Sequence, residues 1–148
     1  MISIDWGTGE VAAIWIKRFK RGPMDPVGEA RAVAGRGLVG NANQGGKRQI
    51  TLIDEARWGE VQRAVGEEVS PVARRANVMV RGIELEKSHR KLLRLGECVI
   101  RIYGETRPCE RMGDLQEAMR AHWRGGAFGE IIEGGTIRVG DEAAWLEE

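Results

Sequence analysis

The sequence predicts a mostly-β (α+β) protein, a closed or half-closed β-barrel with a few short helices. Short segments of alternating or β-branched residues recur along the 148 residues, and glycine, present 21 times, stands at most of the joints between them. No regular strand–helix–strand alternation is visible, which disfavours a doubly wound parallel sheet. Without a repeat, a low-complexity segment or a linker, residues 1–148 are expected to form one domain.

Strands are expected where apolar and polar residues alternate along the chain. These segments are residues 10–17, 29–35, 47–54, 78–80, 98–103 and 136–139. Residues 21–26 contain two prolines and a glycine, so a turn or extended loop is expected there.

Two helices are expected, at residues 55–65 and 114–123. Asp54 would cap the first, and Gly66 would end it. Asp114 would cap the second, with Glu117 at the capping-box position and an apolar stripe on one face. Residues 88–94 would form at most one helical turn, and residues 142–148 form an acidic tail.

The charge distribution suggests an anion-binding face in the middle of the chain. The 23 Lys and Arg nearly cancel the 22 Asp and Glu, leaving a net charge of +1, so nucleic acid is not expected as a partner. Residues 70–94, however, hold seven Lys or Arg and two acids, whereas residues 127–148 hold six acids and one arginine. An ordinary solvated surface is the alternative interpretation.

The cysteines and histidines bear on compartment and metals. Two cysteines do not make a disulfide framework, and the chain shows no signal peptide and no apolar run long enough to span a bilayer. We therefore expect a soluble, cytoplasmic protein with reduced thiols and no membrane partner. His89 and His122 have no neighbouring Cys or His at metal-ligand spacing, so zinc is not expected.

Cys109 is the candidate reactive residue. Gly104 and Pro108 end the strand at residues 98–103 and leave Cys109 on a loop. Arg107 stands two residues before this thiol and Arg111 two residues after it, and nearby guanidinium groups favour the nucleophilic thiolate. The alternative is a small buried hydrophobe, as free cysteines usually are.

A glycine-rich loop at residues 35–46 precedes Arg48. Such a loop lets backbone N–H groups approach an anion closely, although it matches no nucleotide-binding motif. Plain flexibility is the alternative explanation of its composition.

Five stretches of the chain resemble, in order, those of the MOSC family, the domain found at the C-terminus of molybdenum-cofactor sulfurases and as small free-standing bacterial proteins. They are GRGLVG (35–40), RQITLID (48–54), RRANVMVRGIEL (74–85), the LGE…RPCERM segment (95–112) and GEIIEGGTIRVGD (129–141). One departure lies in the glycine-rich loop, where the family often has an acidic residue and a histidine and this chain has Asn41 and Asn43. That departure leaves the role of the loop in holding a substrate open.

The resemblance implies a β-barrel, molybdenum cofactor as ligand, and a site built around one cysteine. By motif match, Cys109 corresponds to the family's cysteine, as a sulfur carrier or as a ligand of the metal. The resemblance places Arg48, Arg75 and Asn77 on the anion-facing side of the site. Arg107 and Arg111, which flank Cys109, are expected to bind the cofactor as well. A pterin phosphate is a dianion or nearly so, and the arginine fork suits it. A surface ion pair is the alternative for each arginine taken singly.

Three functions follow from these expectations. The first is a sulfur carrier or molybdenum-cofactor-binding protein; the second is a molybdenum-dependent reductase of N-hydroxylated compounds; the third is a non-catalytic module for an anionic small molecule. No pyridoxal-phosphate lysine motif is visible, so a cysteine desulfurase partner would have to supply sulfur, and a molybdoenzyme would be its recipient.

Overall fold

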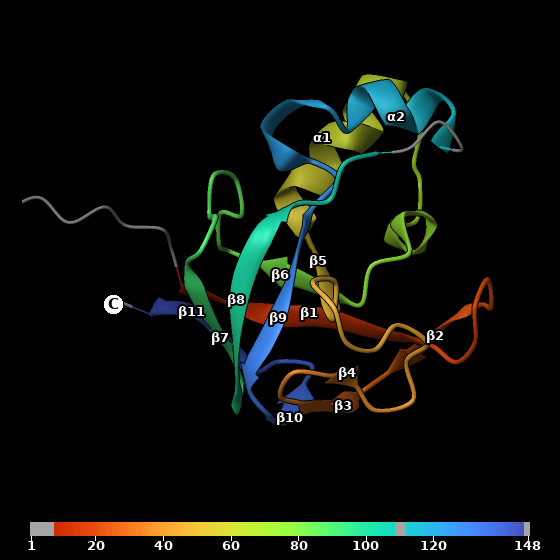
Figure 1. The fold of residues 1–148 in the computed structure, drawn as a ribbon. Coiled ribbons are helices and arrows are strands. Elements are labelled where there is room, and N and C mark those ends of the chain that lie inside the picture. Colours follow the sequence, from red (N-terminus) through yellow and green to blue (C-terminus); the bar gives the residue numbers. More distant parts are fainter. Residues whose placement is uncertain (1–7, 109–111, 147–148) are drawn as a thin grey trace, which may run out of the picture.

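The computed structural model describes residues 8–108 and 112–146 (Figure 1). Strands are the main regular element in these residues, and the helices are few and short, as predicted. The elements, in chain order, are β1 (Thr8–Lys17), β2 (Met24–Val27), β3 (Glu29–Val33), β4 (Gly37–Leu38), β5 (Ile50–Asp54), α1 (Glu55–Val65), the 3-10 helix η1 (Pro71–Arg74), β6 (Val78–Arg81), β7 (Leu92–Leu95), β8 (Cys98–Glu105), α2 (Asp114–Ala118), the 3-10 turn η3 (Ala121–Trp123), β9 (Ala127–Glu133), β10 (Gly135–Arg138) and β11 (Glu142–Leu146).

Seven strands close into a barrel in the order β11-β7-β8-β9-β5-β6-β1, because β11 also pairs with β1. This last pairing is antiparallel and runs from Thr8↔Ala144 to Glu10↔Glu142. Among the described strands, only β5 and β6 pair in parallel, and the connection between them carries α1 and η1, as a parallel crossover requires. The barrel expectation is confirmed.

The barrel interior holds the main hydrophobic core. Residues that alternate along each strand point inward and are buried, such as Ile100 and Ile102 on β8 and Leu93 and Leu95 on β7. Each such side chain contributes about 1.5–3 kcal/mol by leaving water. Strands β8 and β9 approach so closely that a Cβ at Gly129 would lie 2.2 Å from the Arg101 carbonyl oxygen, which explains the glycine.

Helices α1 and α2 cover one end of the barrel, and the small sheet β10-β3-β4 lies at the other end (Figure 1). The helices share a second core of Trp58, Val61, Ala118 and Met119. Asp54 accepts a 2.9 Å hydrogen bond from the Ala56 N–H, so the predicted cap of α1 is confirmed. Within the described residues, no helix is both long and apolar enough to cross a membrane.

The helix expected at residues 114–123 is much shorter. Its regular part ends at Ala118, and the residue before Asp114, Gly113, provides no side-chain cap. The backbone then reverses at His122 and Trp123, both with φ of 54°. Because this reversal brings the Trp123 ring edge-on to His89, at 4.7 Å between centroids, tertiary contact overrides the helical pattern.

The expectations for residues 88–94 and for the acidic tail are wrong. Leu92–Leu95 forms β7, which pairs with both β8 and β11, so its leucines fill the barrel rather than one face of a helical turn. In the tail, Ala143 points inward and is fully buried, and the strand it belongs to closes the barrel. Three further strands were not expected: β2, at the loop expected over residues 21–26, β4, within the glycine-rich loop, and β9.

Candidate functional site

A pocket of about 230 Å³ opens beside the barrel where β1, β5 and β6 meet the helical end. Four of its described lining residues are cations, and none is Asp or Glu. The cations are Lys17, Arg48, Arg74 and Arg75. Lys17 ends β1, Arg48 leads into β5, and the two neighbouring arginines follow one another at the end of η1. The predicted residues Arg48, Arg75 and Asn77 therefore meet in one pocket.

The electrostatics of this pocket are those of an anion site. Burial lowers the pKa of Lys17, and the positive charges of Arg75 and Arg48 lower it further. Within residues 8–108 and 112–146, no carboxylate lies within ion-pair distance of any of these three side chains, whereas Arg57, for example, contacts Glu60, Glu84 and Glu86. Positive charges that are held close together without neighbouring carboxylates favour the binding of an anion between them.

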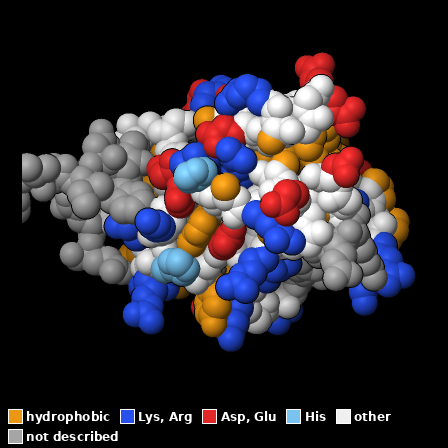
Figure 2. Space-filling model, turned by 90° about the horizontal axis from the view of Figure 1, so that it is seen from above, with side chains coloured by type: hydrophobic (Ala, Val, Ile, Leu, Met, Phe, Trp, Pro, Cys, Tyr) orange, Lys and Arg blue, Asp and Glu red, His pale blue; other side chains and the backbone are white. Residues whose placement is uncertain are grey.

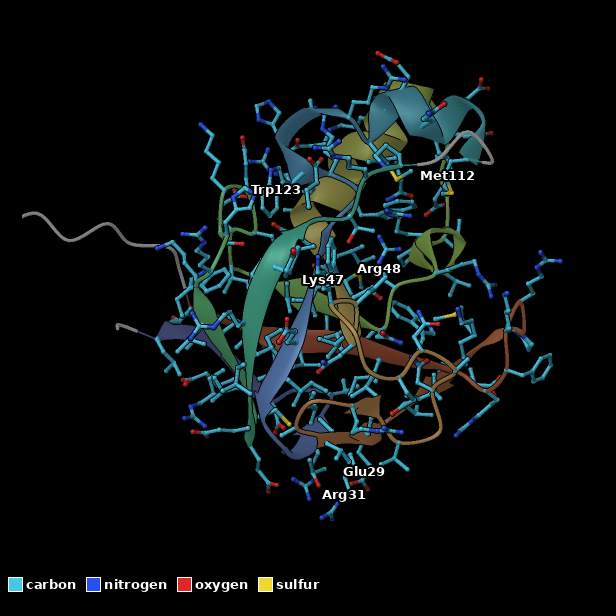
Figure 3. All side chains as sticks on the ribbon, viewed as in Figure 1. Glu29, Arg31, Lys47, Arg48, Met112 and Trp123 are labelled. Carbon is cyan, nitrogen blue, oxygen red and sulfur yellow. The ribbon has the colours of Figure 1, made fainter. Side chains whose placement is uncertain are left out.

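Arg48 and Arg75 are held in different ways. The Arg48 guanidinium lies 5.0 Å from the centroid of the Phe128 ring, a cation–π contact that leaves its N–H groups for other partners. Arg75 has a left-handed backbone, with φ of 61°, and donates one hydrogen bond to the Gly22 carbonyl oxygen. This bond ties the β1–β2 turn to the pocket and orients the guanidinium. Figure 3 shows Arg48 between Met112, which lines this pocket, and Trp123.

Asn77 supports the pocket from within. It is buried, and its Nδ2 donates to the Trp15 carbonyl and to Asn41 Oδ1, both at 3.2 Å. Its Oδ1 accepts from the Thr51 N–H and hydroxyl, also at 3.2 Å. Since both ends of its amide are engaged, Asn77 positions the pocket rather than offering free donors to a ligand.

Asn41 gives the departure in the glycine-rich loop a structural role. Its Oδ1 accepts a 2.9 Å hydrogen bond from the Lys17 backbone N–H and joins it to Asn77. Asn41 and Asn43 both line the pocket. An acidic residue in this loop would add negative charge beside Lys17, so the amides keep the described lining free of carboxylates.

The predicted cysteine site borders the same pocket along the chain. Thr106 and Met112 line the pocket on either side of the segment that contains Cys109. Cys109 and Arg111 themselves lie outside the described residues, so their place in the site stays a prediction. The Thr106 hydroxyl is buried and has no hydrogen-bond partner among the described residues. Its backbone carbonyl accepts a 3.0 Å hydrogen bond from Arg74, which also donates to Gly125.

Arg107 does not line this pocket. It lies in a neighbouring hollow that also contains Arg48 and several aromatic side chains. Lys17, in contrast, lines the pocket and was missed, because the last residue of an alternating strand carries no sequence signal of a site. Cys98 is excluded as a second reactive thiol: burial raises its pKa to about 11, and its Sγ donates to the Gly135 carbonyl at 3.2 Å.

Metal binding finds no support in the described residues. Across residues 8–108 and 112–146, no three or more His, Cys, Asp or Glu side chains are grouped so that they could hold a metal ion. Cys109 lies outside these residues.

The fold and the pocket together describe a small β-barrel protein with a cation-lined pocket. A model of the MOSC domain matches residues 35–144, and the chain belongs to this family. The match covers all five stretches in which the resemblance was found, including the segment around Cys109.

Solved structures share the fold at low sequence identity. The YuaD protein from Bacillus subtilis superposes with a TM-score of 0.80 at 19% identity, over 92% of this chain and 94% of that one. YiiM from Escherichia coli superposes with a TM-score of 0.71 at 16% identity, over 93% of this chain and 70% of that one. YiiM from Geobacillus stearothermophilus superposes with a TM-score of 0.70 at 14% identity, over 94% of this chain and 75% of that one. A search of curated proteins found no match.

Proposed function

We propose that this protein binds the phosphate of a molybdenum-cofactor-type pterin in the pocket of Lys17, Arg48 and Arg75, and that Cys109 carries sulfur or contacts the metal beside it. One observation supports this most directly. Lys17, Arg48 and Arg75 converge on a pocket whose described lining contains no carboxylate, and burial together with the charges of Arg75 and Arg48 lowers the pKa of Lys17.

The residues present fit such a ligand. A phosphate monoester is a dianion or nearly so, and Arg offers paired donors that match two of its oxygens. Arg48 and Arg75 would supply these forks, and Lys17 would add a point charge. When bound, the cofactor would supply a molybdenum centre capable of redox or sulfur chemistry. Asn41 and Asn77 would hold the backbone under Lys17 and keep the cation in place.

The sulfur-carrier role rests on Cys109. Arg107 and Arg111 flank it in the sequence and favour its thiolate. The thiolate would attack the outer sulfur of a donor persulfide, forming a new S–S bond on Cys109 and releasing the donor's own thiolate. The donor would be a partner cysteine desulfurase, which carries the pyridoxal phosphate, and the recipient would be a molybdoenzyme or its cofactor.

A non-catalytic anion-binding module is the second candidate. The observation that favours it is that the described residues of the pocket already include Lys17, Arg48, Arg74 and Arg75. Under this alternative, replacing Cys109 leaves the protein's role unchanged.

Mass spectrometry with metal analysis, on protein purified from a cofactor-producing host, separates these functions. We expect the Cys109 peptide to gain the mass of one sulfur after incubation with a desulfurase and cysteine, and Cys109→Ser to gain none. Molybdenum bound to the parent and lost in Arg75→Ala would support the cofactor. If the protein carries neither persulfide nor molybdenum and Cys109→Ser binds anions as the parent does, the non-catalytic binding module is the correct function. Turnover of N-hydroxylated compounds only after cofactor reconstitution would instead assign the reductase.

A further inference from the structure

A second hollow adjoins the anion pocket and shares Arg48 with it. It has a volume of about 640 Å³, within the range of small-molecule sites. We call it the aromatic groove and define it by six side chains: Arg48, His89, Tyr103, Arg107, Trp123 and Phe128. In Figure 3, Arg48 lies between Trp123 of the groove and Met112 of the pocket. Because Arg48 lines both hollows, a ligand in either one can contact its guanidinium.

The aromatic side chains of the groove form two walls. Tyr103 on β8 and Phe128 on β9 stack with 5.4 Å between ring centroids and 26° between planes, and Tyr103 is 45% exposed. Trp123 meets His89 edge-on at 4.7 Å. Trp123 occupies this place through a left-handed backbone at φ 54°, and such strain in a non-glycine residue is typical of functional sites.

Cations lie against the aromatic rings. Lys47 Nζ is 5.0 Å from the centroid of Tyr103, and the Arg48 guanidinium is 5.0 Å from that of Phe128. Figure 2, which looks down on the helical end, shows hydrophobic, basic and acidic side chains mixed around the two histidines. Aromatic platforms combined with backbone-neutralising cations are how proteins bind nucleotide units.

One carboxylate completes the groove. Glu105 on β8 lines it and has no ion-pair partner among the described residues. A carboxylate accepts hydrogen bonds and repels phosphate, so it suits the exocyclic amino group of a base and not the anionic end of the ligand. The phosphate then belongs at the Arg48 end.

We propose that the aromatic groove binds the planar base of a nucleotide, with its phosphate at Arg48 where the groove meets the anion pocket, and that amino-bearing bases are preferred. The proposal rests on the proposed function in one respect only, that the pocket holds phosphate. A ligand with a base and a phosphate could be a free or cofactor-linked mononucleotide or a single-stranded nucleic acid. We propose the mononucleotide as the ligand.

Calorimetric titration with AMP, UMP, ribose phosphate and inorganic phosphate tests the assignment. Base stacking makes AMP bind about tenfold more tightly than ribose phosphate in the parent. Tyr103→Ala and Trp123→Ala should each remove most of that advantage and leave ribose phosphate binding unchanged. Glu105→Gln should reduce the preference for AMP over UMP. Ile132→Ala, an exposed apolar residue on the same strand as Phe128, is the matched control and should change nothing.

The outcomes separate this inference from the proposed function. Inorganic phosphate binding with no gain from the base overturns the nucleotide assignment and leaves the anion pocket intact. If AMP binding depends on Tyr103 but not on Arg75, the result supports base binding in the aromatic groove and counts against phosphate binding by Arg75 in the anion pocket. A single-stranded oligonucleotide that binds at least about tenfold more tightly than AMP, increasingly with length, overturns the mononucleotide and assigns the groove to nucleic acid. Circular dichroism of each variant shows that it is folded.

Discussion

At the scale of single residues, Lys17 is the clearest sign of the proposed anion site, because it lies in one pocket with Arg48 and Arg75. A lysine at the end of a strand normally turns into water and keeps its ordinary pKa. Here burial and the neighbouring Arg75 and Arg48 lower that pKa, so the charged form is held at a cost in the folded protein. An anion in the pocket relieves this cost. The cluster therefore makes sense as a binding site rather than as a device for stability.

Replacing Arg75 by Ala should raise the pKa of Lys17 towards its ordinary value, because one of its positive neighbours is removed. Burial should still keep the pKa below that value. NMR titration of the lysine side-chain carbons measures the change. Arg31→Ala, on the exposed face of β3, is the matched control and should leave Lys17 unaltered. An unchanged Lys17 pKa in Arg75→Ala would show that the two charges do not interact.

The two cysteines should differ sharply in reactivity. Cys98 is fully buried and its pKa is raised to about 11, so it presents almost no thiolate at neutral pH. Cys109 has Arg107 and Arg111 close by in the sequence. Brief alkylation followed by peptide mapping should label Cys109 well before Cys98. Equal labelling, or faster labelling of Cys98, would remove the basis for a reactive Cys109.

Among the elements, α1 carries a buried acid at its start. Burial raises the pKa of Asp54 to about 6, although its carboxylate caps the helix by accepting from the Ala56 N–H. The folded protein therefore binds more protons than the unfolded chain between about pH 4 and 6. The stability contributed by protonated Asp54 is full below this window and is lost as the pH rises through about 6.

Asp54→Asn should remove this pH dependence, because Asn also caps helices but cannot ionise. At pH 7 the variant should be at least as stable as the parent, with a gain on the order of 2 kcal/mol as the upper expectation. Asp54→Ala should be about 1 kcal/mol less stable than Asp54→Asn, because it removes the same charge and also loses the cap. Urea unfolding at several pH values measures both. A slope of stability against pH that is the same in Asn and parent proteins would refute the buried-charge explanation.

Local sequence predicted those elements whose contacts are local. The start and end of α1 depend on Asp54 and Gly66, which act on their own helix. The helix expected at residues 114–123 failed because the contact of Trp123 with His89 comes from a distant segment. The same limit applies to the site: motif resemblance located Arg48 and Arg75, whereas Lys17 joins them only after β1 and β6 pair.

At the scale of the whole molecule, the last strand closes the barrel. β11 pairs with β1 on one side and with β7 on the other, so it links the first and middle parts of the chain. The acids at its ends, Glu142 before and Glu147 and Glu148 after, hide this role, although residues 143–146 are all apolar and Ala143 is fully buried.

Deleting residues 142–148 should therefore abolish cooperative folding. The deletion leaves unpaired edges on β1 and β7 and exposes the barrel interior to water. Circular dichroism during urea unfolding provides the measurement, and deletion of residues 147–148 alone serves as the control. A truncated protein that unfolds at the parent's urea midpoint would contradict closure by β11.

Calorimetric titration of inorganic phosphate into the parent and the pocket variants tests the central claim, that Lys17, Arg48 and Arg75 form an anion site. Charge-assisted hydrogen bonds contribute roughly 1.5–3 kcal/mol, so Arg48→Ala or Arg75→Ala should weaken binding about tenfold or more. Arg75→Lys should recover only part of the loss, because it keeps the charge without the fork. The Arg31→Ala control should bind like the parent. If both pocket alanine variants remain folded and bind phosphate as the parent does, the anion site lies elsewhere.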